Sequence, residues 1–521
     1  MRISIACHAA VLLLAFGLSA CGDMATDDGA TYPSPSPTTG YPEQPSGDKY
    51  DAVGTNPFVV TAHDPLSTFA VDVDTASYDI FRRDIELGTL PNPDSVRLEE
   101  YVNYFPYSYT PPSADSDVPF SITLRAALNP HGNTTLMAVG IKGKEIPWSK
   151  RPANLVFLVD VSGSMSASNK LPLLKKMLLE ALDVLDPEDT LSLVTYAGNT
   201  SVRLTPTPVS DRATIEAAIS GLSSGGSTAG AAGITLAYQQ AKAGFIEGGI
   251  NHVLLCTDGD FNVGASSTDA LVQLIEEKRK TGITLTVLGF GYGNLNDAMM
   301  EAITNAGNGI YSVISSEDQA ISYVHKRLLQ TFNQIAKDVK IQVELNPEKV
   351  LAYRLLGYEN RALADDQFKD DRVDAGEVGS GHTVTALYEL VLVGDTIPTP
   401  EGAPAPLDGE ATDHVCEVPS AELARVRVRY KAPDASEEDP ASQVEQGLTP
   451  AQAAGKLEHA PGDLQWAAAI ATFAEIVKQS PFARPESLDT LTGIVSAQAG
   501  TDADRLEFVG LLSKARGLLG K

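Results

Sequence analysis

The chain has 521 residues, which is enough for about three domains at roughly 150 residues each. Hydrophobic residues make up 43% of it and charged residues 20%, which excludes a chain that is disordered throughout and a protein with many membrane spans. The net charge is -28, with 39 Lys and Arg against 67 Asp and Glu. Such a charge repels nucleic-acid phosphates and is compatible with divalent cations, so we expect no nucleic-acid partner.

The N-terminus carries an export signature. Arg2 precedes a mostly apolar run from Ile3 to Leu18, and small residues stand just before Cys21. A lone run of this length is compatible with an uncleaved membrane anchor, but the small residues before the cysteine resemble a bacterial lipoprotein signal. The resemblance implies that residues 1–20 are a signal peptide and that Cys21 is acylated, which anchors the chain in a membrane. Gly22 after the cysteine implies sorting to the outer membrane.

Residues 21–57 are predicted to form a tether. Pro, Ser, Thr, Gly and Asp dominate this segment, and no period of 2 or 3.6 residues appears in it. A coil of this kind reaches roughly 30–35 Å. We therefore expect the folded part of the chain to stand away from the membrane.

An N-terminal flanking domain is predicted at residues 58–150. Asp72 and Asp74 alternate on a predicted strand that leads into a helix. They are compatible with a second metal site, although capping and surface charge explain them more simply. Five aromatic residues follow: Tyr101, Tyr104, Phe105, Tyr107 and Tyr109. Local core packing is favoured for these residues over a binding patch.

Apolar runs alternate with helical patterns between residues 151 and 320. The run Asn154–Val159 is continuously apolar after its first residue, as a strand covered on both faces requires. Further strands are predicted at 190–196, 252–257 and 283–290, with amphipathic helices between them. This alternation predicts an α/β fold with a doubly wound, mostly parallel sheet. In such sheets, ligands bind beyond the carboxyl ends of the strands.

Oxygen-bearing side chains follow the ends of two of these strands. Asp160, Ser162 and Ser164 form an Asp-x-Ser-x-Ser sequence after the first strand. Asp258 follows a later strand, and Thr228 lies in a Gly-rich loop between the two. An all-oxygen set without His or Cys is typical of a site for Mg²⁺, Mn²⁺ or Ca²⁺ rather than for zinc.

These five residues resemble, in order and spacing, the metal-ion-dependent adhesion site of von Willebrand factor type A domains. The phrases at 256–264 and 289–294 are similar to a bacterial lipoprotein subfamily in which two flanking domains surround the type A domain. The resemblance implies a bound divalent cation, Mg²⁺ first of all, with Asp160 or its serines and Thr228 as direct ligands and Asp258 acting through water. It also implies an open position that a carboxylate of a partner protein completes. An ordinary strand-end turn and a purely structural metal remain alternatives.

The C-terminal flanking domain is predicted at residues 321–521, β-rich to about residue 430 and helical from about 462. We expect its strands to join those before the type A domain in one β-sandwich, with the type A domain inserted. Residues 431–461 are predicted to be a linker. Two apolar stripes predict a helical cap packed on the β part: Trp466, Ile470, Phe473 and Val477, and then Leu506, Val509 and Leu512.

The sequence thus predicts a lipid-anchored envelope protein, at the outer membrane and facing the periplasm, that engages a protein partner through a bridging cation. A scaffold with a purely structural metal is the alternative, and a metal-dependent hydrolase is less favoured because no general base is evident beside Asp160 and Asp258. We expect no enzyme: Gly221–Gly225 matches G-x-S-x-G, but a helix rather than a strand precedes it. A disulfide between Cys256 and Cys416 is possible but not expected.

Overall fold

The computed structural model of the chain describes residues 47–520 except for 72–73, 131, 147–150, 227–229, 260–267, 329–332, 374, 410–413 and 437. The predicted signal peptide, Cys21 and most of the tether lie outside these residues. Within the described part of the chain, no helix is both long enough and apolar enough to cross a membrane.

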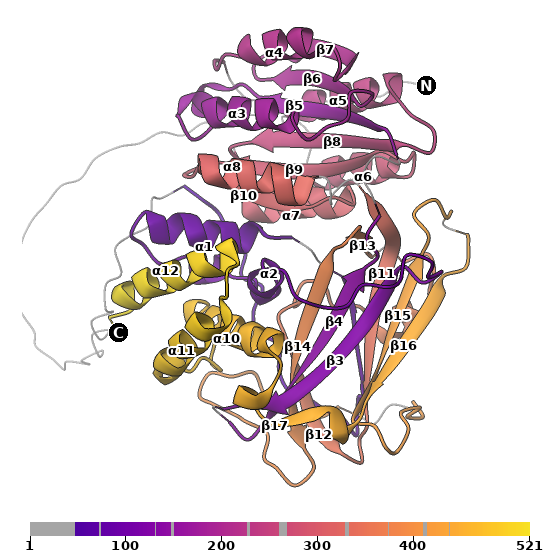
Figure 1. Cartoon of the computed structure of the whole chain (residues 1–521), viewed down its shortest axis with the longest axis vertical. Helices are drawn as coiled ribbons and strands as arrows, with labels where there is room; N and C mark the ends of the chain where they lie inside the picture. The colour runs from indigo at the N-terminus through magenta and orange to yellow at the C-terminus, as the bar shows by residue number, and fades with distance from the viewer. Residues whose placement is uncertain are drawn as a thin grey trace, which may run out of the picture. The chain divides into compact units, whose positions relative to one another are not determined.

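The alternating segment forms a six-stranded sheet (Figure 1). Its strands are β5 (Ala153–Asp160), β6 (Thr190–Tyr196), β7 (Ser201–Pro208), β8 (Ile250–Thr257), β9 (Thr284–Phe290) and β10 (Tyr311–Ile314). Their order is β10-β9-β8-β5-β6-β7, and all neighbours pair in parallel except β6 and β7. Every residue of β5 and β8 is buried, as continuous apolar runs require. The predicted doubly wound α/β sheet is confirmed.

Helices cover both faces of this sheet. One face packs on α3 (Leu171–Ala181), α4 (Arg212–Ser220) and α8 (Glu317–Tyr323). The other face packs on α5 (Gly230–Ala243), α6 (Thr268–Arg279) and α7 (Asp297–Ala306). Helix α1 (Ala76–Glu86), from the N-terminal flank, joins this second face through Ala76 and Ile80, both fully buried. The type A core therefore contains residues from outside the predicted type A segment.

Strands from both sides of the type A segment form a β-sandwich. One sheet has the order β1-β12-β14-β4-β3-β17, and the other has the order β13-β11-β15-β16 with β2 paired to β11. The strands are β1 (Val59–Val60), β2 (Leu66–Ala70), β3 (Phe120–Leu128), β4 (Thr135–Gly143), β11 (Gln334–Leu345), β12 (Val350–Leu356), β13 (Gly376–Gly379), β14 (Thr383–Leu392), β15 (Ala424–Lys431), β16 (Ser442–Leu448) and β17 (Ala453–Lys456). Since β4 precedes the type A segment and pairs with β14 after it, the predicted joined sandwich is confirmed. Met137, Val343 and Val426 of the two sheets share one core.

The prediction of a linker at 431–461 is wrong. Strand β16 extends one sheet by pairing with β15, and β17 pairs in parallel with β3 of the other. Most side chains of β16 are exposed or half-buried because it lies at a sheet edge. Its polar sequence therefore lacks the apolar alternation by which a buried strand is recognised.

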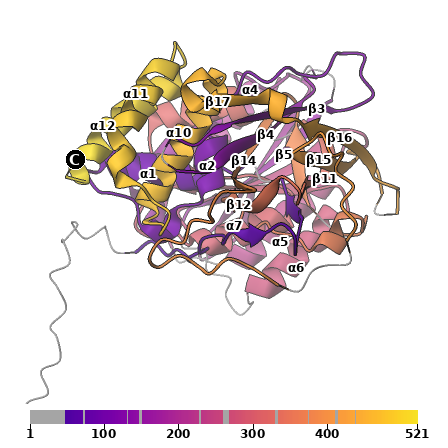
Figure 2. The ribbon, with the colours of Figure 1, turned by 90° about the horizontal axis from the view of Figure 1, so that it is seen from below.

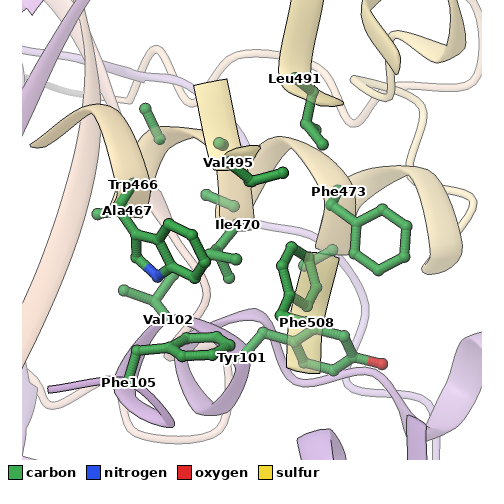
Figure 3. Close-up of a cluster of buried hydrophobic side chains, with 14 of the residues drawn as sticks. Tyr101, Val102, Phe105, Trp466, Ala467, Ile470, Phe473, Leu491, Val495 and Phe508 are labelled. Carbon is green, nitrogen blue, oxygen red and sulfur yellow. The ribbon is translucent and has the colours of Figure 1, made fainter. Parts of the chain in front are cut away.

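Three C-terminal helices, α10 (Gly462–Val477), α11 (Leu488–Gln498) and α12 (Ala503–Leu518), form the predicted cap. Helix α10 packs on α2 (Leu98–Asn103) and contacts β14, α12 packs on α1, and α11 packs on α10 and α12. The three helices lie beside α1 and α2 in Figure 2. Figure 3 shows Trp466, Phe473 and Phe508 packed together in this core. The predicted stripe on α12 is partly wrong, because Leu506 is 51% exposed while Phe508 is fully buried.

The aromatic residues of the N-terminal flank belong to the same core. Four of the five are buried: Tyr101, Tyr104, Phe105 and Tyr107. Tyr109 is partly buried against them, with its ring stacked on that of Tyr107 at 5.5 Å. Core packing, and not an exposed binding patch, accounts for this cluster.

Candidate functional site

The Asp-x-Ser-x-Ser sequence lies where the strand order of the type A sheet reverses. Strand β5 has β8 on one side and β6 on the other, and the chain continues from β5 to β6 before it returns to β8. Val159 of β5 is directly opposite Cys256 of β8 in the parallel register. Asp160 and Asp258, which follow at the ends of these strands, therefore reach the same edge of the sheet. This topological switch point is where doubly wound sheets bind their ligands.

The carboxylate of Asp160 organises the turn after β5. The Ser162 backbone N–H donates to Asp160 Oδ1 at 2.8 Å, and the Thr257 hydroxyl donates to Oδ2 at 3.3 Å. The hydroxyl oxygens of Ser162 and Ser164 lie 2.9 Å apart. Three of the predicted ligands thus converge in one turn, and Thr257 of the neighbouring strand orients the carboxylate among them.

The Gly-rich loop reaches the same turn through two backbone hydrogen bonds. Gly163 N–H donates to the Gly226 carbonyl at 3.1 Å, and Gly225 N–H donates to the Val161 carbonyl at 2.7 Å. Gly226 has a φ of +90°, a left-handed conformation that glycine adopts readily. Thr228 lies two residues further on, outside the described residues, so its approach to Asp160 stays a prediction.

Burial determines the electrostatics of this edge. Asp160 and Asp258 are both completely buried. Burial raises the pKa of Asp160 to about 6; hydrogen bonds from Ser162 oppose this rise, and the negative charge of Asp258 adds to it. A cation placed between such carboxylates would relieve both effects.

The chemistry of the donor set fits a hard divalent cation. The converging groups are carboxylate and hydroxyl oxygens, the ligands that Mg²⁺ and Ca²⁺ prefer. Within the described ranges, no group of three or more His, Cys, Asp or Glu side chains is arranged to hold a metal. A metal at this edge would therefore depend on the serine hydroxyls as well as on Asp160.

Lys170 is a component of this edge that sequence reasoning missed. It is the N-cap residue of α3, and its ammonium lies 2.8 Å from Asp258 Oδ2. The Asn294 side chain donates to the same oxygen at 3.4 Å. The sequence shows only a lysine shortly before a helix, so nothing in it signals the contact with Asp258. A lysine therefore does lie at the site, paired with the Asp258 carboxylate.

The loop after β9 is held by Asp48, which lies inside the predicted tether at 21–57; the prediction of a tether is therefore wrong for its last residues, which bond to the type A domain. Gly293 N–H and Leu295 N–H both donate to Asp48 Oδ1 at 2.8 Å. Asp48 is in turn paired with Arg83, whose Nη1 lies 3.0 Å from its second oxygen. The loop carries Asn294 between these two amides, so Asp48 supports one wall of the site.

The other predicted candidates lie elsewhere. Asp74 is buried, accepts from the Tyr311 N–H at 2.7 Å and is paired with Arg361 at 3.1 Å, so its charge is neither at the surface nor part of a metal cluster. Asp72 lies outside the described residues. Cys256 and Cys416 are both free thiols.

Comparisons with known proteins identify the relatives of this chain. A family described as "von Willebrand factor type A domain" matches residues 154–327, one described as "von Willebrand factor" matches 44–138, and one described as "Uncharacterized protein YfbK, C-terminal" matches 330–518. The Escherichia coli (strain K12) protein "Uncharacterized protein YfbK" is 38% identical over 484 residues, which cover 91% of this chain and 82% of that protein.

Other relatives are less similar in sequence. Inter-alpha-trypsin inhibitor heavy chain H3 of Mesocricetus auratus is 26% identical over 211 residues, which cover 38% of this chain and 23% of that protein. Among solved structures, a von Willebrand factor type A protein from Catenulispora acidiphila is 16% identical with a TM-score of 0.43, covering 78% of this chain and 90% of that one.

Proposed function

This chain belongs to the family of the Escherichia coli protein YfbK, in which flanking domains surround a von Willebrand factor type A domain, and we propose that its type A domain binds a divalent cation and, through it, an acidic residue of a protein partner. Type A domains typically mediate protein interactions. The names of its relatives indicate no enzymatic activity, which favours a binding module over a hydrolase.

The observation that carries the proposal is the convergence of Asp160, Ser162 and Ser164 in one turn at the switch point, beside the buried Asp258. These residues would hold the cation, with Thr228 as a further predicted ligand. Mg²⁺ suits this set best, and when bound it would supply positive charge at an open position that a partner's carboxylate can occupy.

The residues of the chain itself prepare this contact. The Ser162 N–H and the Thr257 hydroxyl fix the orientation of the Asp160 carboxylate before any ligand arrives. The net charge of -28 repels an acidic partner at long range. A local positive charge at the contact is therefore what allows an acidic residue to bind here.

A lipid on Cys21 is the proposed membrane anchor, with the protein at the outer membrane and facing the periplasm. The small residues before Cys21 and the Pro-rich segment after it support this part of the proposal. Labelled palmitate should be incorporated into the wild type and not into a Cys21→Ser variant. Incorporation into both proteins would contradict acylation at Cys21.

Metal binding is tested by titrating the full chain with Mn²⁺ and following the free ion by electron paramagnetic resonance. We expect one bound ion in the wild type, no binding in Asp160→Ala, and unchanged binding in Asp366→Ala, which removes an exposed carboxylate far along the chain. Ser162→Ala and Ser164→Ala weaken the site without removing its charge, so they replace Asp160→Ala if that variant does not fold. Absence of Mn²⁺ binding to the wild type would refute the metal site.

The adhesion role is tested by affinity capture from the native envelope with Mg²⁺ or with a chelator. We expect a partner that is retained only with Mg²⁺ and only by protein with an intact Asp160. A folded Asp160→Ala variant that captures the same partner would favour the scaffold alternative with a purely structural metal. Metal-dependent turnover of a panel of phosphoesters and peptides would instead favour the hydrolase.

A further inference from the structure

The Lys170 side chain is built into the site. Its ammonium lies 2.8 Å from Asp258 Oδ2, and the lysine side chain is only 8% exposed while that of Asp258 is completely buried. The stem of the lysine packs against Gly291, where a Cβ atom would lie 2.8 Å from Lys170 Cγ and 2.9 Å from Cε. Gly291 also has a φ of +79°, so both its conformation and the passing lysine require glycine there. Glycine at position 291 thus leaves the space that the lysine stem occupies.

The lysine changes the charge balance of the proposed metal site. Asp160 and Asp258 carry two negative charges, and Lys170 reduces their sum to one. A divalent cation would then leave the site with one positive charge, which a single carboxylate from a partner would cancel. Without Lys170, the same cation and two carboxylates would already be neutral before any partner arrived.

We propose that Lys170 is a resident counter-cation of Asp258 that weakens metal binding at the Asp160 site and strengthens the binding of a carboxylate ligand to the metal-loaded site. This inference rests on the proposed function. Its physical basis is that a fixed positive charge 2.8 Å from Asp258 repels a metal ion at this site and attracts an anion, in an interior where water screens charges poorly. Lys170 therefore acts as a residue that sets ligand specificity, since it makes an acidic partner necessary for neutrality.

The test compares three full-length variants in the Mn²⁺ titration. Lys170→Met removes the charge and keeps a long apolar stem, Lys170→Arg keeps the charge, and Lys176→Met removes an exposed lysine of the same helix as a matched control. We expect Lys170→Met to bind Mn²⁺ on the order of tenfold more tightly than the wild type. Lys170→Arg and Lys176→Met should stay within about threefold of the wild type.

A second readout uses acetate as the carboxylate ligand. Acetate added to the Mn²⁺-loaded protein should perturb the spectrum of the bound ion at a concentration on the order of tenfold lower in the wild type than in Lys170→Met. Mn²⁺ affinity in Lys170→Met that is equal to or weaker than in the wild type would overturn the inference while leaving the proposed metal site intact. A wild type that binds no Mn²⁺ would instead refute the proposed function itself. Lys170→Gln serves the same purpose if Lys170→Met does not fold.

Discussion

Arg97 links the N-terminal flank to the type A domain through buried ion pairs. Its side chain is 1% exposed and pairs with Glu100 of α2 and with Asp297 of α7, whose Oδ2 lies 2.5 Å from Arg97 Nη1. Glu301 lies 3.6 Å from the same nitrogen and keeps Arg361 as a second partner at 3.7 Å. Removing the guanidinium would therefore leave mainly the carboxylates of Glu100 and Asp297 without this positive charge, and both side chains are at most 2% exposed.

An Arg97→Met variant should be destabilised by about 3–5 kcal/mol, because removing one partner of a buried pair leaves the other charge uncompensated. Urea unfolding followed by circular dichroism measures this difference. Arg372→Met is the matched control, since that side chain is 84% exposed and forms an ion pair with Asp370 of its own loop; it should change stability by less than about 0.5 kcal/mol.

A double-mutant cycle with Asp297→Asn separates the ion pair from the loss of packing. The coupling energy between Arg97 and Asp297 should be at least about 1.5 kcal/mol, because the second substitution removes the carboxylate that the first leaves buried. Additive effects of the two substitutions, or an Arg97→Met variant within about 1 kcal/mol of the wild type, would refute the reasoning.

Three further changes test other parts of the molecule. Asp48→Ala removes the acceptor of two loop amides, so hydrogen exchange at Gly293 should quicken by at least tenfold, and an unchanged rate would contradict this support of the loop. Phe508→Ala should cost about 3–5 kcal/mol by thermal unfolding, whereas Leu506→Ala, which truncates a half-exposed side chain, should cost less than about 1 kcal/mol. Burial lowers the pKa of His252 to about 3, so the unfolded chain binds a proton below about pH 6.5 that the folded chain does not. The free energy of unfolding therefore decreases as the pH falls, by about 1.4 kcal/mol per unit between about pH 6 and 4. In urea unfolding, His252→Gln should show a correspondingly shallower decrease over the same range.

The strands of the type A sheet and the Asp160 turn could be predicted because their signals are local. A continuous apolar run marks a doubly covered strand, and polar residues directly after it must lie at the sheet edge. The contact of Lys170 with Asp258 could not be predicted, since it joins residues 88 positions apart that no periodicity relates. Helix α1 could be predicted, but its burial could not: ten of its eleven residues are buried, yet four of those ten are charged and are accommodated by ion pairs and hydrogen bonds, most of them with distant segments.

The inserted arrangement has a consequence for the order in which the protein can be completed as it is synthesised. Strand β2 can pair only after β11 has been synthesised, and β4 can pair with β14 only after β14 has been synthesised. Asp74 accepts a hydrogen bond from Tyr311, which is synthesised 237 positions later. A nascent chain that has just finished β4 therefore still has apolar surfaces whose partners do not yet exist. Such a topology is expected to fold slowly and late, with β2 among the last strands to form its pairing.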